Sequence, residues 1–176
     1  MPPELADVDG NSESGRGTVS VFNGVEPIIQ TFASPDEERT AVGKWLGDRV
    51  TEGVPPHEIG VFVRAGGQLR RAQAAVKAAG LIAVQLSEKI ETAPGSVSIG
   101  AMHLAKGLEF RAVAVMACDD EVIPLQERIE NVADEADLED VYNTERHLLY
   151  VDCTRARDHL LVTGVDPGSE FLVDLC

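Results

Sequence analysis

The chain has 176 residues, of which 44% are hydrophobic, and this content is enough for one compact domain with its own apolar core. Its net charge of −15 excludes a protein that binds nucleic acid through an extended basic surface, so any DNA contact must be local. Three scattered cysteines exclude a disulfide framework, and the lack of a run of about 20 apolar residues excludes a membrane helix. We therefore expect a cytoplasmic protein with no membrane partner and no protein-held metal site.

The first 18 residues differ in composition from the rest of the chain. They combine prolines and glycines with acidic residues and serines, and they offer little apolar surface to offset the entropy lost on ordering. The sequence therefore predicts a disordered arm or linker over residues 1–18 and a single globular domain over residues 19–176.

Strand-like apolar runs then alternate with helical patterns along the domain. Alternation of this kind favours an α/β fold, an open parallel sheet with helices on both faces. The expected strands are residues 27–32, 59–63, 81–84, 97–99, 113–116 and 160–163.

Two helices are predicted in the first half of the domain. Ser34 can cap the first, with Pro35 at its first position, and Gly53 ends it before the next strand. The second covers Leu69 to Ala79, where apolar residues recur every three or four positions, and Gly80 closes it.

Acidic residues dominate the segment from Asp119 to Asp140, which contains the single base Arg128 and is expected to be a surface loop. A helical pattern follows from about Leu138 to Ala156. Glu145 falls in its otherwise apolar stripe, so we expect this carboxylate to have a polar partner.

Three segments adjoin predicted strands: Phe62–Arg64, Ala101–Phe110 and Thr144–Arg157. Open α/β sheets bind ligands at one edge, beyond the carboxyl ends of their strands. We therefore expect Arg64 and Arg155 to lie near each other at one edge of the sheet. Taken singly, an isolated arginine is typical of an ordinary solvated or ion-paired charge, and only the surrounding motifs favour a functional role.

Two of these segments carry long motifs. Met102-His-Leu-Ala-Lys-Gly-Leu-Glu-Phe110 resembles motif V of the UvrD, Rep and PcrA helicases of superfamily 1, and Leu148-Leu-Tyr-Val-Asp-Cys-Thr-Arg-Ala-Arg157 is similar to their motif VI. Ile59–Arg64 resembles the looser motif IV, and the resemblance extends over about residues 19–165. The chain departs from the family pattern at Ala101, where Thr or Ser is usual, and at Thr144 and His147 in the Glu-Glu-Arg-Arg run.

The resemblance implies the second, C-terminal RecA-like motor domain of a DNA helicase, with ATP and Mg²⁺ held mainly by an N-terminal partner domain. By position, Arg155 matches the arginine finger that reaches the γ-phosphate, and Arg64 matches a second arginine near the same phosphate. Glu109 matches the acid that binds the ribose, and Gly107 and Lys106 belong to the same loop. The resemblance places His103, with Lys106, beside single-stranded DNA.

No Gly-x-x-x-x-Gly-Lys-Ser/Thr phosphate loop occurs in the sequence, so the chain alone is not expected to hydrolyse ATP. The partners implied are an N-terminal RecA-like domain and single-stranded DNA. Residues 65–100 are too few to hold the large accessory domain that UvrD and Rep insert there.

Two other functions stay open. The chain could be a non-catalytic module that binds a protein through its acidic segment, and a phosphate loop encoded upstream of Met1 would favour the helicase instead. A general single-strand binder is disfavoured by the aromatic content of 5%, because such proteins stack bases on aromatic rings.

Overall fold

The computed structural model describes residues 5–6, 12–13, 25–89 and 92–175. The first two of these ranges are β1 (Leu5–Ala6) and β2 (Ser12–Glu13), which pair antiparallel. The remainder of the predicted arm over residues 1–18, and the predicted start of the domain at residue 19, lie outside the described residues. Both therefore stay predictions.

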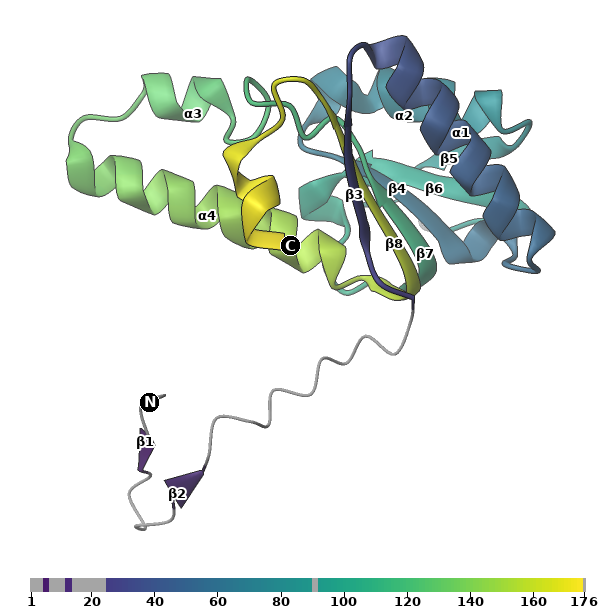
Figure 1. Cartoon of the computed structure of the whole chain (residues 1–176), viewed down its shortest axis with the longest axis horizontal. Coiled ribbons are helices and arrows are strands. Elements are labelled where there is room, and N and C mark those ends of the chain that lie inside the picture. The colour runs from purple at the N-terminus through teal and green to yellow at the C-terminus, as the bar shows by residue number, and fades with distance from the viewer. Residues whose placement is uncertain (1–4, 7–11, 14–24, 90–91, 176) are drawn as a thin grey trace.

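The domain is built on a six-stranded sheet (Figure 1). Every neighbouring pair of strands is parallel, and each of the six expected strands is present. In order across the sheet the strands are β3 (Ile28–Phe32), β8 (Ala156–Val165), β7 (Phe110–Val115), β4 (Ile59–Val63), β6 (Ser96–Ala101) and β5 (Ile82–Gln85). The predicted parallel α/β fold is confirmed.

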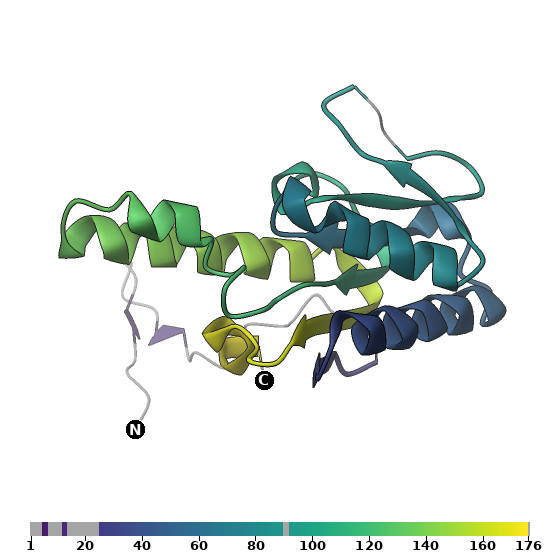
Figure 2. The same ribbon diagram turned by 90° about the horizontal axis from the view of Figure 1, so that it is seen from above.

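Helices cover both faces of this sheet, as predicted. On one face α1 (Pro35–Thr51) and α2 (Leu69–Ala78) lie side by side (Figure 2). On the other face lie α4 (Glu135–Cys153) and the C-terminal 3₁₀ turn η4 (Glu170–Leu175). Shorter elements complete the domain: η1 (Pro56–Glu58), η2 (Gly66–Gln68), η3 (Met102–Leu104) and α3 (Gln126–Glu130).

Helix α1 begins where the sequence predicts. The Ser34 hydroxyl accepts a hydrogen bond from the Glu37 amide at 3.2 Å, and the Glu37 carboxylate accepts one from the Ala33 amide at 3.2 Å. These bonds satisfy amides that the helix itself leaves unpaired, an effect of about 1 kcal/mol for a cap. The local sequence alone therefore fixes the start of α1.

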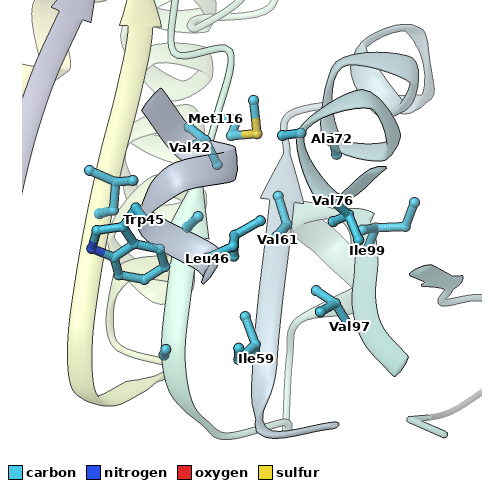
Figure 3. Packing of buried hydrophobic residues seen from close by; sticks show 14 of the residues in the cluster. Val42, Trp45, Leu46, Ile59, Val61, Ala72, Val76, Val97, Ile99 and Met116 are labelled. Carbon is cyan, nitrogen blue, oxygen red and sulfur yellow. The ribbon is translucent and has the colours of Figure 1, made fainter. Parts of the chain in front are cut away.

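The core between α1, α2 and the sheet is formed mainly by aliphatic side chains, together with Trp45 and Met116 (Figure 3). Val42 and Leu46 of α1 are fully buried and face Ile59 and Val61 of β4. All five residues of β4 are buried, which accounts for its unbroken apolar sequence. Burying each such side chain stabilises the fold by roughly 2 kcal/mol.

A second core lies on the α4 face. Successive strand residues point to opposite faces, so Phe62 of β4 faces α4 while Val61 faces α1. The pairing of β7 with β8 is irregular between Phe110 and Ala112, where β8 contains one extra residue, and Phe110 faces α4. The rings of Phe62 and Phe110 then meet with centroids 5.7 Å apart.

The acidic segment is more ordered than predicted. Instead of one surface loop over residues 119–140, it contains α3, and α4 already begins at Glu135. The Asp134 carboxylate caps α4 by accepting from the Asp137 amide at 2.9 Å. Acidic side chains are favourable in the first turn of a helix because they face the positive end of its dipole. The charge that suggested a loop therefore stabilises a helix start.

A buried polar network joins α1 to the carboxyl ends of β7 and β8. Glu38 is fully buried and accepts hydrogen bonds from the Thr163 hydroxyl at 2.7 Å, the Ala117 amide at 2.9 Å, and Arg71. Arg71 also pairs with Asp119. Ala117 has a φ of 58°, which is costly for a residue with a Cβ, so its bond to Glu38 stabilises a strained turn.

Gly164 on β8 is required beside this turn. A Cβ atom added at Gly164 would lie 2.5 Å from the Cys118 carbonyl oxygen, closer than any side chain tolerates. The turn after β7 therefore packs directly against the backbone of β8.

Candidate functional site

Arg155 follows α4 and immediately precedes β8. Its half-buried side chain is held by neutral acceptors: Nε donates to the Val151 carbonyl at 3.1 Å, Nη1 to the Leu108 carbonyl at 3.5 Å and Nη2 to the Thr154 hydroxyl at 3.2 Å. These bonds orient the guanidinium group and leave its charge uncompensated by an ion pair.

Most other described arginines differ from Arg155 in this respect. Eight of them pair with a carboxylate, namely Arg39, Arg49, Arg64, Arg71, Arg111, Arg128, Arg146 and Arg157. Among residues 25–89 and 92–175, only Arg70 and Arg155 form no such pair, and Arg70 is fully exposed on α2. Arg155 therefore stands out as an oriented cation that is available to an anionic ligand.

The loop before β7 lies against Arg155. Gly107 has a φ of 82°, which confirms that glycine permits a turn here that other residues rarely adopt. Glu109 is exposed, and the residues on either side of it bind Arg155. The Leu108 carbonyl accepts a hydrogen bond from the Arg155 side chain, and the Phe110 amide donates one to the Arg155 carbonyl at 2.9 Å. The structure thus brings Gly107, Glu109 and Arg155 together at the amino ends of β7 and β8.

Arg64 follows β4 and is buried, with 8% of its surface exposed. Nε and Nη2 each donate to the Glu145 carboxylate at 2.6 Å, so the pair is bidentate. Glu145 is fully buried and also accepts from Arg128 at 2.8 Å and from the Leu125 amide at 3.1 Å. The prediction that Glu145 has a polar partner is confirmed.

These bonds also determine the ionisation of Glu145. Burial alone would raise the pKa of its carboxyl, but the hydrogen bonds and charge of Arg64, with Leu125 and Arg128, outweigh burial and lower the pKa. Glu145 is therefore ionised at neutral pH, and it compensates the charge of Arg64.

The prediction that Arg64 and Arg155 share one edge of the sheet is wrong. Helix α4 runs back along the sheet against the strand direction, so Arg155 at its end reaches the amino edge, whereas Arg64 follows the carboxyl end of β4. The six residues of β7 separate the two levels, about 20 Å of strand rise. Both arginines nevertheless lie on the α4 face. The charges of both are close enough to act on the buried carboxyl of Asp152 in α4.

His103 and Lys106 are exposed and lie on the connection between β6 and β7. His103 belongs to η3, directly after the carboxyl end of β6, and Lys106 lies beside Gly107. The structure therefore places the two residues along one exposed segment, in which Lys106 is next to the loop that contacts Arg155.

Asp152 is a buried residue that the sequence analysis missed. Its side chain is fully buried, and neither carboxyl oxygen has a hydrogen-bond partner. Burial raises the pKa of Asp152 to about 8, although the charges of Arg155 and Arg64 act to lower it. The helical stripe offers a signal that could have found it, since Asp152 lies one turn after Leu149 and two turns after Glu145.

Two surface hollows lie away from these residues. One of about 430 Å³ lies between α4 and η4, and one of about 470 Å³ lies beside α1. None of the predicted site residues lines either hollow.

The described residues contain neither a metal-binding cluster nor a membrane-spanning helix. No group of His, Cys, Asp or Glu side chains in residues 25–89 and 92–175 is arranged to hold a metal ion. Nor does any helix in the described part of the chain have the length and apolar content to cross a membrane.

Three known proteins are similar to part of this chain in sequence. The chain is 39% identical over 82 residues to YjcD of Bacillus subtilis, 31% over 104 residues to the ATP-dependent DNA helicase PcrA of the same organism, and 37% over 77 residues to DNA helicase II of Rickettsia typhi. These matches cover 46%, 52% and 44% of the chain, but only 10%, 13% and 11% of the relatives. The chain thus spans a small part of their length.

The fold agrees with these matches. The C-terminal domain of a possible DNA helicase from Lactobacillus plantarum superposes with a TM-score of 0.64 at 24% identity, and the alignment covers 89% of this chain and 86% of that one. Residues 69–166, more than half of the chain, match the family of UvrD-like helicase C-terminal domains. Since this range contains both long motifs and the residues that surround Arg155, the chain belongs to the UvrD-like helicase C-terminal domain family.

Proposed function

We propose that this domain is the C-terminal motor half of an ATP-dependent DNA helicase. Arg155 supplies the arginine finger to MgATP that is held by the phosphate loop of an N-terminal RecA-like domain. Glu109 accepts a hydrogen bond from the ribose, and Gly107 shapes the loop that presents Glu109. His103 and Lys106 contact single-stranded DNA.

The observation that carries this proposal is the state of Arg155. Phosphoryl transfer depends mainly on stabilising charge on the phosphate oxygens, and a guanidinium group already committed to a carboxylate would contribute less. Arg155 is oriented by three neutral acceptors and forms no ion pair with the described carboxylates. Its charge is therefore available to the γ-phosphate.

Arg64 takes a different place in this proposal. It is buried at the carboxyl edge of the sheet, opposite to Arg155, and its Nε and Nη2 are committed to Glu145. We therefore assign Arg64 a structural role in holding Glu145 and no contact with the γ-phosphate. We also propose that the helicase domain begins at residue 19.

Replacing Glu109 by glutamine tests the ribose contact. In the complete helicase we expect KM for ATP to rise about tenfold with kcat nearly unchanged, the result for a contact that is equally strong in the ground and transition states. Steady-state ATP hydrolysis at saturating single-stranded DNA measures both constants. Glu121→Gln, which changes an exposed acid in the segment after β7, is the matched control. An unchanged KM in Glu109→Gln would refute the ribose assignment.

Replacing His103 and Lys106 together by alanine tests the DNA contact. We expect the dissociation constant for a short single-stranded oligonucleotide to rise about tenfold at low salt, and the salt dependence to become shallower because a cationic contact is lost. Fluorescence anisotropy measures both effects. Lys44→Ala, on the α1 face, is the control, and equal weakening in the two proteins would contradict a local DNA contact.

A further inference from the structure

Asp152 is the buried group that the proposed function does not use. Glu145, two turns earlier on α4, accepts four hydrogen bonds, whereas neither oxygen of Asp152 has a partner. A buried carboxyl without hydrogen bonds is costly, and such groups are few in folded proteins. This position therefore calls for an explanation other than stability.

The surroundings of Asp152 connect it to the proposed site. Arg155 follows it by three residues at the end of the same helix, and Arg64 approaches from the end of β4. Both positive charges act on the Asp152 carboxyl, yet neither arginine forms an ion pair with it. Arg64 is held by Glu145, and Arg155 is held by neutral acceptors.

Few other titratable groups face this carboxyl from the surrounding elements. The Cys153 thiol is its neighbour on α4, and the Cys118 thiol approaches from the turn after β7. Burial raises the pKa of both thiols, so both are neutral at ordinary pH. His103 of η3 is exposed, and Asp158 of β8 pairs with Arg111 at 2.7 Å. Arg155 is therefore the nearby cation without a carboxylate partner.

We propose that Asp152 is a positioning residue for Arg155 and acts as a proton-controlled inhibitor of the finger. The neutral carboxyl leaves the guanidinium charge available to a triphosphate. The ionised carboxylate pairs with the guanidinium and withdraws it from the triphosphate. This inference rests on the proposed function of Arg155.

The present contacts of Arg155 make this exchange favourable. Its bonds to neutral oxygens measure 3.1 to 3.5 Å, and a charge-assisted bond to a carboxylate is shorter and about twice as strong. An ionised Asp152 three residues away would therefore compete with these acceptors. The bidentate pair with Glu145 keeps Arg64 from compensating Asp152 in its place.

The expected pH dependence follows from the burial of Asp152. With a pKa of about 8, its carboxyl is neutral at pH 7 and becomes ionised as the pH rises above 8. A bound triphosphate adds negative charge nearby and raises this pKa further, so ATP binding and ionisation of Asp152 oppose each other. The inhibited form therefore accumulates at alkaline pH.

The test is the pH profile of ATP hydrolysis by the complete helicase, compared with that of Asp152→Asn, whose side chain stays neutral. We expect kcat of the variant divided by kcat of the wild type to rise about tenfold between pH 7 and one pH unit above the midpoint, because about 90% of Asp152 is then ionised. Asp48→Asn, which changes an exposed carboxylate on α1, should give a ratio that does not vary with pH. A constant ratio for Asp152→Asn would overturn the proposal.

A second measurement covers the case in which the variant does not fold. In the wild-type chain, ¹³C NMR of the aspartate carboxyl groups should show one resonance that titrates near pH 8, and its titration near pH 4 would also overturn the proposal.

Failure of the proposed finger role of Arg155 can be distinguished from failure of the role of Asp152. If Arg155→Ala keeps wild-type turnover, the finger assignment is wrong; if it abolishes turnover while the pH ratio stays constant, only the role of Asp152 is wrong.

Discussion

Replacing Arg155 by alanine in the complete helicase is expected to lower kcat for ATP hydrolysis by about 10³-fold or more, the usual contribution of an arginine finger. The expectation follows from the geometry. The guanidinium is the oriented cation at the amino edge of the sheet, and it forms no ion pair with a described carboxylate. Removing it takes away charge stabilisation that water cannot replace in a closed cleft. Steady-state turnover at saturating ATP and single-stranded DNA measures the effect.

Two further variants sharpen this measurement. Arg157→Ala removes an exposed arginine two residues away, whose partner Glu58 lies at 3.5 Å, and should retain turnover within a few-fold. Arg155→Lys keeps the charge but loses the planar donor fork, so it should restore only a small part of the rate. Wild-type turnover in Arg155→Ala would exclude the finger role, and equal losses in Arg155→Ala and Arg157→Ala would indicate a general disturbance of the edge.

Replacing Glu145 by alanine is expected to lower the free energy of unfolding by about 3 to 5 kcal/mol, because removing one partner leaves the buried Arg64 uncompensated. The carboxylate accepts both donors of Arg64 at 2.6 Å and also binds Arg128 and the Leu125 amide. Urea denaturation of the chain at pH 7, followed by circular dichroism, measures the change. Glu139→Ala, an exposed position on the same helix, should change stability by less than about 0.5 kcal/mol.

The sign of the pH dependence provides a further check on Glu145. Its pKa is lowered in the folded state, so its stabilising effect is fully present above the unfolded value of 4.5 and is lost as the pH falls through the lower folded value. The difference between the wild type and Glu145→Ala should therefore narrow in acid. A difference that stays constant down to about pH 2 would show that the ion pair is not its source.

The fold follows closely from the sequence where local chemistry decides the structure. Ser34 caps α1 because a hydroxyl at that position satisfies a free amide, and the unbroken apolar run of β4 requires burial on both faces. The partner of Glu145 could be anticipated for a similar reason, since a charge within an apolar stripe must be compensated. The identity of that partner depended on the tertiary fold.

Three features depended on contacts between distant segments. The network of Glu38, Arg71 and Asp119 joins α1, α2 and the turn after β7, and no local pattern specifies these partners. The burial of Glu38 alone could have been predicted, because it lies one helical turn before the buried Val42. The separation of Arg64 from Arg155 depends on the direction in which α4 returns across the sheet. The burial of Asp152 follows the stripe of α4, but its lack of any partner is evident only from the packed structure.

The connection between β6 and β7 has a mechanical consequence. Residues 102–109 leave the carboxyl end of β6 and return to the amino end of β7, a distance of at least the 17 Å or so that the parallel strands rise. Eight residues reach at most about 27 Å when fully extended, and η3 shortens part of this length. The segment is therefore short, so a large displacement at one end would be transmitted to the other. A nucleotide that moves Glu109 would in this way shift His103 along the bound strand, without a hinge or a separate lever.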